Sequence, residues 1–254
     1  MSGCPRTQMM AQAGVTLPPR HPPILLSKQV AKSPSATPMR RPGSYLPPMF
    51  QQLSPSDQGE LQRLCQIETY VKGDIIQAEG ERSPRVWTII SGWATISIKG
   101  VVVGLSGPGR IYTAAMGSSP VNVTTFATLG SLMALSFDRE EVMRVLSRNP
   151  LVLLGFVDLT IGRVLEYQTF LHHRGLASIE QRIAEVLWGV STPQPDGSRL
   201  VPDEINQTVL ASMLQTSREE VGKKRKLLVA SGHLSRRETG WHLDRTTPML
   251  SFLG

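Results

Sequence analysis

One long apolar segment limits the folds open to this chain more than any other part of its sequence. It is LVLLGFVDLTIGRVLEYQTFLHH, residues 151–173, directly after Pro150. Its apolar residues recur at steps of three and four, which predicts a helix of more than twenty residues with one apolar face: Leu151, Leu154, Val157, Ile161, Val164, Leu165 and Leu171. A small domain does not cover so long a stripe, so we expect a helix of a second subunit to cover it. The alternative is packing entirely against the chain's own β-rich region.

The residues before this helix are typical of an antiparallel β-roll. Segment 54–64 predicts a short helix, and brief runs rich in Val, Ile, Thr and Trp follow it. Glycines separate these runs at positions where turns with a positive φ are expected: Gly73, Gly80, Gly92, Gly100 and Gly109. Helical spacing then returns in residues 138–150.

The residues after the long helix predict a small helical unit. Gly175 is expected to end the long helix, and Ser178 with Gln181 predicts a capping box for the next one. That next helix has a predicted core face of Ile183, Val186 and Leu187.

Two further helices follow with a short turn between them. The first has an apolar face and a small residue where two crossing helices approach closely, which predicts this buried set: Ile205, Val209, Ala211, Met213 and Leu214. Ser217 with Glu220 predicts a second capping box at the start of the second helix. Val221 comes ten residues after Ala211, which is the core spacing of a helix-turn-helix. Segment 233–243, HLSRRETGWHL, then predicts a β-hairpin, the wing of a winged helix.

The second of these helices carries the residues that we expect to read DNA. At 100° per residue, one face within about 140° holds Arg218, Glu219, Gly222, Lys223 and Lys226. Arginine pairs with the acceptors of guanine and glutamate accepts from the amine of cytosine, so we assign base reading to Arg218, Glu219 and Lys223. The predicted contacts to the DNA backbone are Ser217, Lys224, Arg225, Lys226, and Arg236 and Arg237 near the hairpin tip. The alternative is a solvated charged face in which Glu219 and Lys223 form an i,i+4 pair.

Net charge alone is weak support for this prediction. The chain carries +7, but residues 1–45 hold six Lys and Arg and no acidic residue, which leaves +1 (7 − 6) for the rest. Local clustering is the useful signal, and Lys223–Lys226 is the densest cationic cluster. Residues 1–48 contain ten of the nineteen prolines and predict a disordered tail, with a basic arm that attracts phosphate as the alternative.

From about residue 50 to 247 the chain resembles the Crp/Fnr family of bacterial transcription regulators. TSREEVGKKRKLLVASGHL (216–234) is similar to the family pattern CSRETVGRILKMLEDQNLI. The resemblance implies that Arg218 and Glu219 read a G and a C in each half-site and that Lys223 replaces a base-contacting arginine. Gln215 stands where the turn usually has Gly.

The resemblance also implies a cyclic-nucleotide cassette, which the residues do not match. Tyr112 and Thr113 stand where a Gly-Glu pair is expected, Val121 and Asn122 stand near the arginine position, and 111–123 contains no cation. A buried cyclic phosphate would stay unpaired there, so we expect no cyclic AMP or GMP binding in the usual mode. A pocket for another effector would be lined by Tyr112, Thr113, Tyr167 and Gln168.

Other chemistries have little support in the sequence. Two cysteines, Cys4 and Cys65, are too few for an iron–sulfur cluster, so no cofactor is expected, although haem or another effector stays open. A catalytic metal in the roll would need clustered histidines, and there is none between His21 and His172. We therefore expect no enzyme and no metal. Two cysteines are also too few for a disulfide framework, so we expect a reducing, cytoplasmic setting. No apolar run reaches the roughly 18 residues of a membrane helix or resembles a signal peptide.

The sequence thus predicts an α+β chain: a tail (1–48), an N-terminal antiparallel β-roll (49–150), a long dimerisation helix and hinge (151–175) and a C-terminal winged helix-turn-helix (176–254). The predicted function is a homodimeric regulator that binds double-stranded DNA at pseudo-palindromic sites, with RNA polymerase as a candidate further partner. The alternatives are a protein-interaction module that has lost DNA reading and a haem- or redox-sensing regulator.

Overall fold

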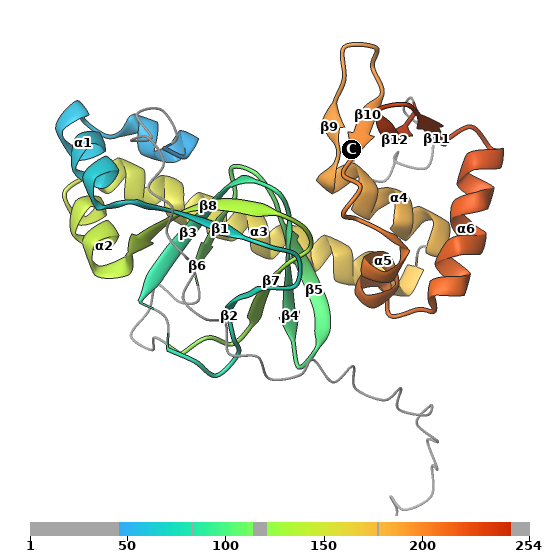
Figure 1. The fold of residues 1–254 in the computed structure, drawn as a ribbon, viewed down its shortest axis with the longest axis horizontal. Helices are drawn as coiled ribbons and strands as arrows, with labels where there is room; N and C mark the ends of the chain where they lie inside the picture. Colours follow the sequence, from blue (N-terminus) through green and yellow to red (C-terminus); the bar gives the residue numbers. More distant parts are fainter. Residues whose placement is uncertain (1–45, 83, 114–120, 177, 245–254) are drawn as a thin grey trace, which may run out of the picture.

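The computed structural model describes residues 46–82, 84–113, 121–176 and 178–244 (Figure 1). The predicted tail lies outside the described residues except for its last three. One of these, Leu46, is buried together with Phe50 of the 3₁₀ helix η1 (Pro48–Gln52), so the folded part of the chain includes the end of the predicted tail.

The predicted β-roll is confirmed as two four-stranded antiparallel sheets. One has the order β1-β8-β3-β6, with strands Gln66–Tyr70, Leu132–Asp138, Arg85–Ser91 and Ile111–Thr113. The other has the order β2-β7-β4-β5, with strands Ile75–Gln77, Thr125–Thr128, Ala94–Ile98 and Val101–Ser106. All five glycines expected at turns have a positive φ, between 78° and 88°, a region that L side chains rarely adopt.

Apolar side chains fill the roll and cover one of its outer faces. Between the sheets lie Trp87, Ile89, Ala94, Ile96, Tyr112, Phe126, Leu132 and Ala134. A second cluster joins the β1-β8-β3-β6 sheet to helices α1 (Pro55–Leu64) and α2 (Arg139–Ser147) and to the first turns of α3, through Val152, Leu153 and Phe156. The start of α3 is thereby fixed to the roll.

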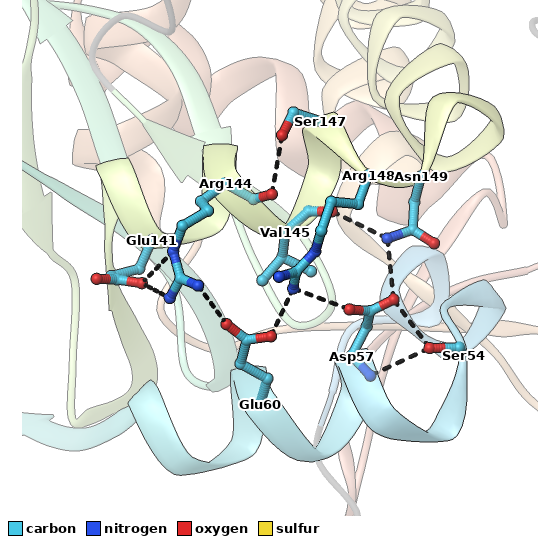
Figure 2. A network of polar contacts seen from close by, with 9 residues as sticks. All are labelled: Ser54, Asp57, Glu60, Glu141, Arg144, Val145, Ser147, Arg148 and Asn149. Atoms are coloured by element: carbon cyan, nitrogen blue, oxygen red, sulfur yellow. Dashed lines mark hydrogen bonds and ion pairs between the residues drawn. The ribbon is translucent and has the colours of Figure 1, made fainter.

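Ion pairs between α1 and the end of α2 also fix the start of α3 (Figure 2). The Arg148 guanidinium lies 2.9 Å from an Asp57 oxygen and 2.5 Å from a Glu60 oxygen, and Arg144 lies 2.9 Å from Glu60. The amide of Asn149 donates to Asp57 at 3.1 Å. Because Pro150 opens α3 directly after Asn149, this network fixes where the long helix begins.

The long helix α3 extends over Pro150–Leu176, which confirms the predicted helix and corrects its end. Gly175 does not end it, because the helical backbone continues to Leu176. Among the described residues no single helix is long and apolar enough to cross a membrane, and α2 with the first half of α3 meets those criteria only as a pair bent by 120°. In Figure 1, α3 runs from α2 along the roll toward the C-terminal helices.

The C-terminal residues form three helices and a four-stranded sheet, within the part of the chain that is described. The helices are α4 (Ile179–Val190), α5 (Gln207–Leu214) and α6 (Arg218–Ala230). The sheet has the order β11-β12-β10-β9, with strands Leu234–Arg237, Gly240–Leu243, Arg199–Val201 and Thr192–Pro193. The capping box of Ser178 and Gln181 is present, and the predicted core residues of α4 and α5 are buried.

The roll and the C-terminal helices are in contact. Leu105 of β5 is buried in the same cluster as Leu210 and Leu214 of α5. The Val102 N–H donates to the Ser212 hydroxyl at 3.4 Å. α5 is therefore packed against the β4–β5 hairpin of the roll.

Candidate nucleic-acid interface

Side-chain caps fix the starts of the two helices α5 and α6. The Asn206 side chain accepts hydrogen bonds from the N–H groups of Thr208 and Val209, and the Ser217 hydroxyl accepts from the Glu220 N–H at 3.0 Å. The predicted second capping box is only half present. The Glu220 carboxylate lies 3.7 Å from the ammonium of Lys224, and in this described segment it accepts no hydrogen bond from the Ser217 N–H.

Gln215 makes the turn between the two helices with a left-handed backbone, at φ 51° and ψ 49°. This conformation normally favours glycine at the end of a helix. The Thr216 N–H donates to the Ala211 carbonyl at 3.0 Å, and Arg182 of α4 donates to the Leu214 carbonyl at 2.8 Å. The turn geometry is therefore kept without glycine, with these bonds closing the end of α5.

The predicted base-reading residues share one exposed face of α6. Arg218, Glu219, Lys223 and Lys226 are all exposed, and together with Gly222 they line an open hollow of about 790 Å³. Within the described residues, none of the three cations on this face forms an ion pair. The alternative pair between Glu219 and Lys223 is likewise not formed there, so these charges are available to a partner.

Three residues that the sequence reasoning missed line the same hollow: Gln207, Val229 and Trp241. Gln207 begins α5, and its amide oxygen lies 3.4 Å from where a Cβ on Gly222 would stand. The glycine in a run of helix-forming residues was the available signal, since it indicates that another group approaches the helix at that point.

Two of the predicted backbone contacts are engaged inside the protein. Lys224 lies 2.8 Å from a carboxylate oxygen of Glu180 on α4, and this hydrogen bond raises the pKa of the lysine and lowers that of the glutamate. The Arg225 guanidinium lies 3.8 Å from the ring centre of Trp241 on β12. Burial lowers the pKa of Arg225, and the nearby Arg236 lowers it further.

The two hairpin arginines also have acidic partners. Arg236 lies 3.1 Å from Asp203. Arg237 is paired with both Asp196 and Asp244, and the bond to Asp196 is the main reason that its pKa is raised. Both side chains are more than a third exposed, so each reaches a phosphate only by exchanging an existing partner.

The long helix presents a second free face, which is apolar. Six of the residues predicted on its stripe are between 45% and 80% exposed: Leu151, Leu154, Val157, Ile161, Val164 and Leu165. The side chain of the seventh, Leu171, lies outside the described residues. The alternative that the stripe packs entirely against the roll is therefore wrong.

The residues suggested for an effector pocket are spread over different surroundings. Tyr112 is buried between the sheets, where its ring stacks on Phe126 at 3.9 Å and its hydroxyl lies 2.7 Å from that of Thr124. The Thr113 hydroxyl is buried on its strand, and Gln168 is exposed. The side chain of Tyr167 lies outside the described residues.

Potential metal ligands do not gather in the described part of the chain, where no group of three His, Cys, Asp or Glu is arranged to hold a metal. Cys65 is half-buried at the end of α1, and burial raises the pKa of its thiol. The side chains of His172 and His173 lie outside the described residues.

No family model matches the chain, and no curated protein matches it either. Solved structures do match. FixK2 from Bradyrhizobium japonicum has a TM-score of 0.64 at 15% identity over 74% of this chain and 96% of its own. CLP, the c-di-GMP responsive global regulator from Xanthomonas campestris, has a TM-score of 0.58 at 18% identity, over 76% of this chain and 100% of its own. A CRP-family transcriptional regulator from Thermus thermophilus has a TM-score of 0.53 at 14% identity, over 72% of this chain and 95% of its own.

At identities this low the likeness concerns the fold. The chain has a Crp/Fnr-like fold. The match extends over most of this chain and over almost the whole length of each of these neighbours.

Proposed function

We propose that this protein is a sequence-specific DNA-binding transcription regulator that binds pseudo-palindromic sites as a homodimer. The observation that carries the proposal is the exposed face of α6, on which Arg218, Glu219 and Lys223 stand without partners among the described residues. The regulator-like fold supports it, as does the placement of this helix directly after the α5–α6 turn. The α5–α6 pair with the β11–β12 hairpin is then a winged helix-turn-helix.

In this proposal the first turns of α6 enter the major groove. Arg218 donates to the O6 and N7 acceptors of a guanine, and Glu219 accepts from the N4 amine of a cytosine. Lys223 lies one turn further along the same face and contacts a third base. Gly222, between them, leaves room for the amide of Gln207, which lies on the same face.

The neighbouring groups hold the DNA backbone. Ser217, at the start of the helix, and Lys226, about two turns further along, are both exposed and contact phosphates directly. Arg236 and Arg237 contact phosphates at the hairpin after releasing Asp203 and Asp196, so their net contribution is smaller than that of a cation without a partner.

The apolar face of α3 is the proposed dimer interface. Two such helices packed about a two-fold axis cover each other's apolar stripes, and each protomer then carries one α6 toward DNA. A two-fold dimer of this kind binds half-sites about 10 base pairs apart, centre to centre.

Control by cyclic AMP or GMP is not part of the proposal. The roll interior at Tyr112 is filled by stacked aromatic rings, and the sequence there provides neither a glutamate nor an arginine for a cyclic nucleotide. We propose that the protein has no resident cofactor and acts in the cytoplasm. Its partners there are DNA and, as a further partner, RNA polymerase. A haem- or redox-sensing regulator is the second candidate for control, carried by the half-buried thiol of Cys65.

Selection of bound duplexes from a random pool tests this function. The full-length protein should enrich a two-fold symmetric motif with G and C in each half-site, and repeating the selection with candidate small molecules, haem among them, identifies an effector. If the pool is not enriched while the protein is a folded dimer, the rival function, a protein-interaction module without DNA reading, replaces this one.

A further inference from the structure

The four consecutive cations of α6 do not have the same surroundings. Lys223 and Lys226 point to the exposed face and have no ion pair among the described residues. Lys224 and Arg225, between them, contact neighbouring elements and are partly buried. The run thus contains two cations without an ion pair among the described residues and two that contact neighbouring elements, of which Arg225 also lines the hollow on the exposed face.

The buried stripe of α6 is narrow. Only Val221 and Leu228 of its thirteen residues are buried. At 100° per residue, Lys224 and Arg225 lie about 50° to either side of the midline of that stripe. Contacts on both flanks of that stripe oppose a roll of the helix about its axis.

The two flanking contacts differ in kind and reach different neighbours. On one side, Lys224 bonds to Glu180 of α4 at 2.8 Å, with both side chains about three-quarters buried. On the other side, the Arg225 guanidinium stacks on the indole of Trp241, 3.8 Å from the ring centre. α6 is therefore held between α4 and the strand β12.

We propose that Lys224 and Arg225 are positioning residues that fix the rotation of α6 about its own axis. A roll of about 100° would put each residue of the helix in the place of its neighbour in sequence, so the rotation decides which side chains meet the bases. The inference rests on the proposed function, and it assigns to these two residues a role different from phosphate binding.

The sign of one substitution separates the two roles. Glu180→Gln removes a negative charge near the interface. If Lys224 binds phosphate, this variant releases the lysine from its nearer carboxylate, leaving only Glu220 at 3.7 Å, and strengthens DNA binding. If Lys224 is a positioning residue, Glu180→Gln and Lys224→Met weaken binding to the selected site by a similar factor, on the order of threefold to tenfold.

The stacked pair is tested in the same assay. Trp241→Leu carries no charge change, and Arg225→Met keeps the apolar stem of the side chain. Both should weaken binding to the selected site, and the double variant should lose little more than either single variant. Arg225→Lys keeps the charge but loses the flat contact with the indole, so it should remain weakened.

Salt dependence provides the control. Affinities of the full-length protein for the selected duplex are measured over a series of salt concentrations, and circular dichroism confirms that each variant is folded. Lys226→Met should reduce the slope of log affinity against log salt by about 0.9, the value for one phosphate contact. Lys224→Met and Arg225→Met should leave that slope unchanged.

Two outcomes overturn the inference separately from the proposed function. If wild type selects a sequence, but Glu180→Gln binds more tightly and Trp241→Leu binds as wild type does, the positioning role is wrong and the function stands. If Lys224→Met and Arg225→Met reduce the slope as Lys226→Met does, both residues are phosphate contacts. A folded wild type that ignores duplex DNA overturns the function and the positioning role together.

Discussion

Two helices of this chain each keep one face free of the rest of the molecule, and the two faces are opposite in chemistry. Among its described side chains α3 exposes six apolar residues of the stripe, whereas α6 exposes Arg218, Glu219, Lys223 and Lys226. Apolar surface in water is unfavourable by about 25 cal/mol per Å², while charged groups are well hydrated. Permanent burial of the α3 face against a partner is therefore favourable, whereas the face of α6 can stay in water between binding events.

The difference also separates how the two faces respond to conditions. Pairing of apolar helices depends weakly on salt, whereas contacts between cations and phosphate weaken steeply as salt displaces them. Raising the salt concentration should therefore release DNA before it separates the protomers.

The largest expected effect comes from breaking the apolar face. Ile161→Glu places a charge in the proposed interface and, because a two-fold interface contains the position twice, removes roughly 3–6 kcal/mol of dimer stability. Analytical ultracentrifugation should show monomers, and affinity for a palindromic site should fall with it. Thr160→Glu adds the same charge beside the stripe and should leave the dimer intact; equal effects of both variants would remove the interface from this face.

A smaller loss is expected from the charged face. Arg218→Ala should cost about 1–3 kcal/mol of binding and relax the preference at one base pair, with the dimer unchanged. Binding assays on a set of single-base variants of the site measure this. A loss that is equal on all sequences would make Arg218 a phosphate contact.

A substitution in the turn before α6 should have a still smaller effect, and it should stabilise the protein. Gln215 has a left-handed backbone, so Gln215→Gly should raise the free energy of unfolding by roughly 0.5–1 kcal/mol. Lys99 also has a positive φ, and Lys99→Gly should change stability in the same direction. Urea unfolding checks both; a destabilised Gln215→Gly variant would show that the side-chain contacts of Gln215 outweigh the backbone cost.

The smallest effect concerns the network that fixes the start of α3. The pKa of Asp57 is lowered by its hydrogen bonds with Asn149 and Ser54, and that of Glu60 by its bond with Arg148 (Figure 2). A lowered carboxyl pKa adds stability above the unfolded-state pKa, and this stability is lost as pH falls through the folded value. Melting temperatures measured below pH 5 should therefore fall less steeply in Arg148→Met than in wild type; parallel curves would contradict this role.

The sequence predicts local features well where spacing alone determines them. The stripe of α3, the glycine turns of the roll and the Ser178 capping box follow from periodicity and backbone preference, and the structure confirms each. Two details differ from the prediction, each for its own reason. Glu220 lies near Lys224 in place of closing its capping box, and Gly175 is carried along in the last turn of a long helix.

The division of labour within the Lys223–Lys226 run was beyond the reach of sequence reasoning. Four adjacent cations look alike along the chain, and their partners, Glu180 and Trp241, come from other elements of the fold. The same holds for Gln207, which reaches the candidate interface only because α5 crosses α6 at Gly222. Periodicity places a residue on a face of its own helix, but it does not show what that face meets.

A footprint of the complex on the selected duplex, combined with its stoichiometry, tests the central claim most directly. The account predicts two protomers per duplex and two protected half-sites in the major groove, about 10 base pairs apart. The Ile161→Glu variant, as a monomer, should protect only one half-site, and only weakly. Uniform protection along the duplex, or one protomer bound to an asymmetric site by the wild-type protein, would contradict the account.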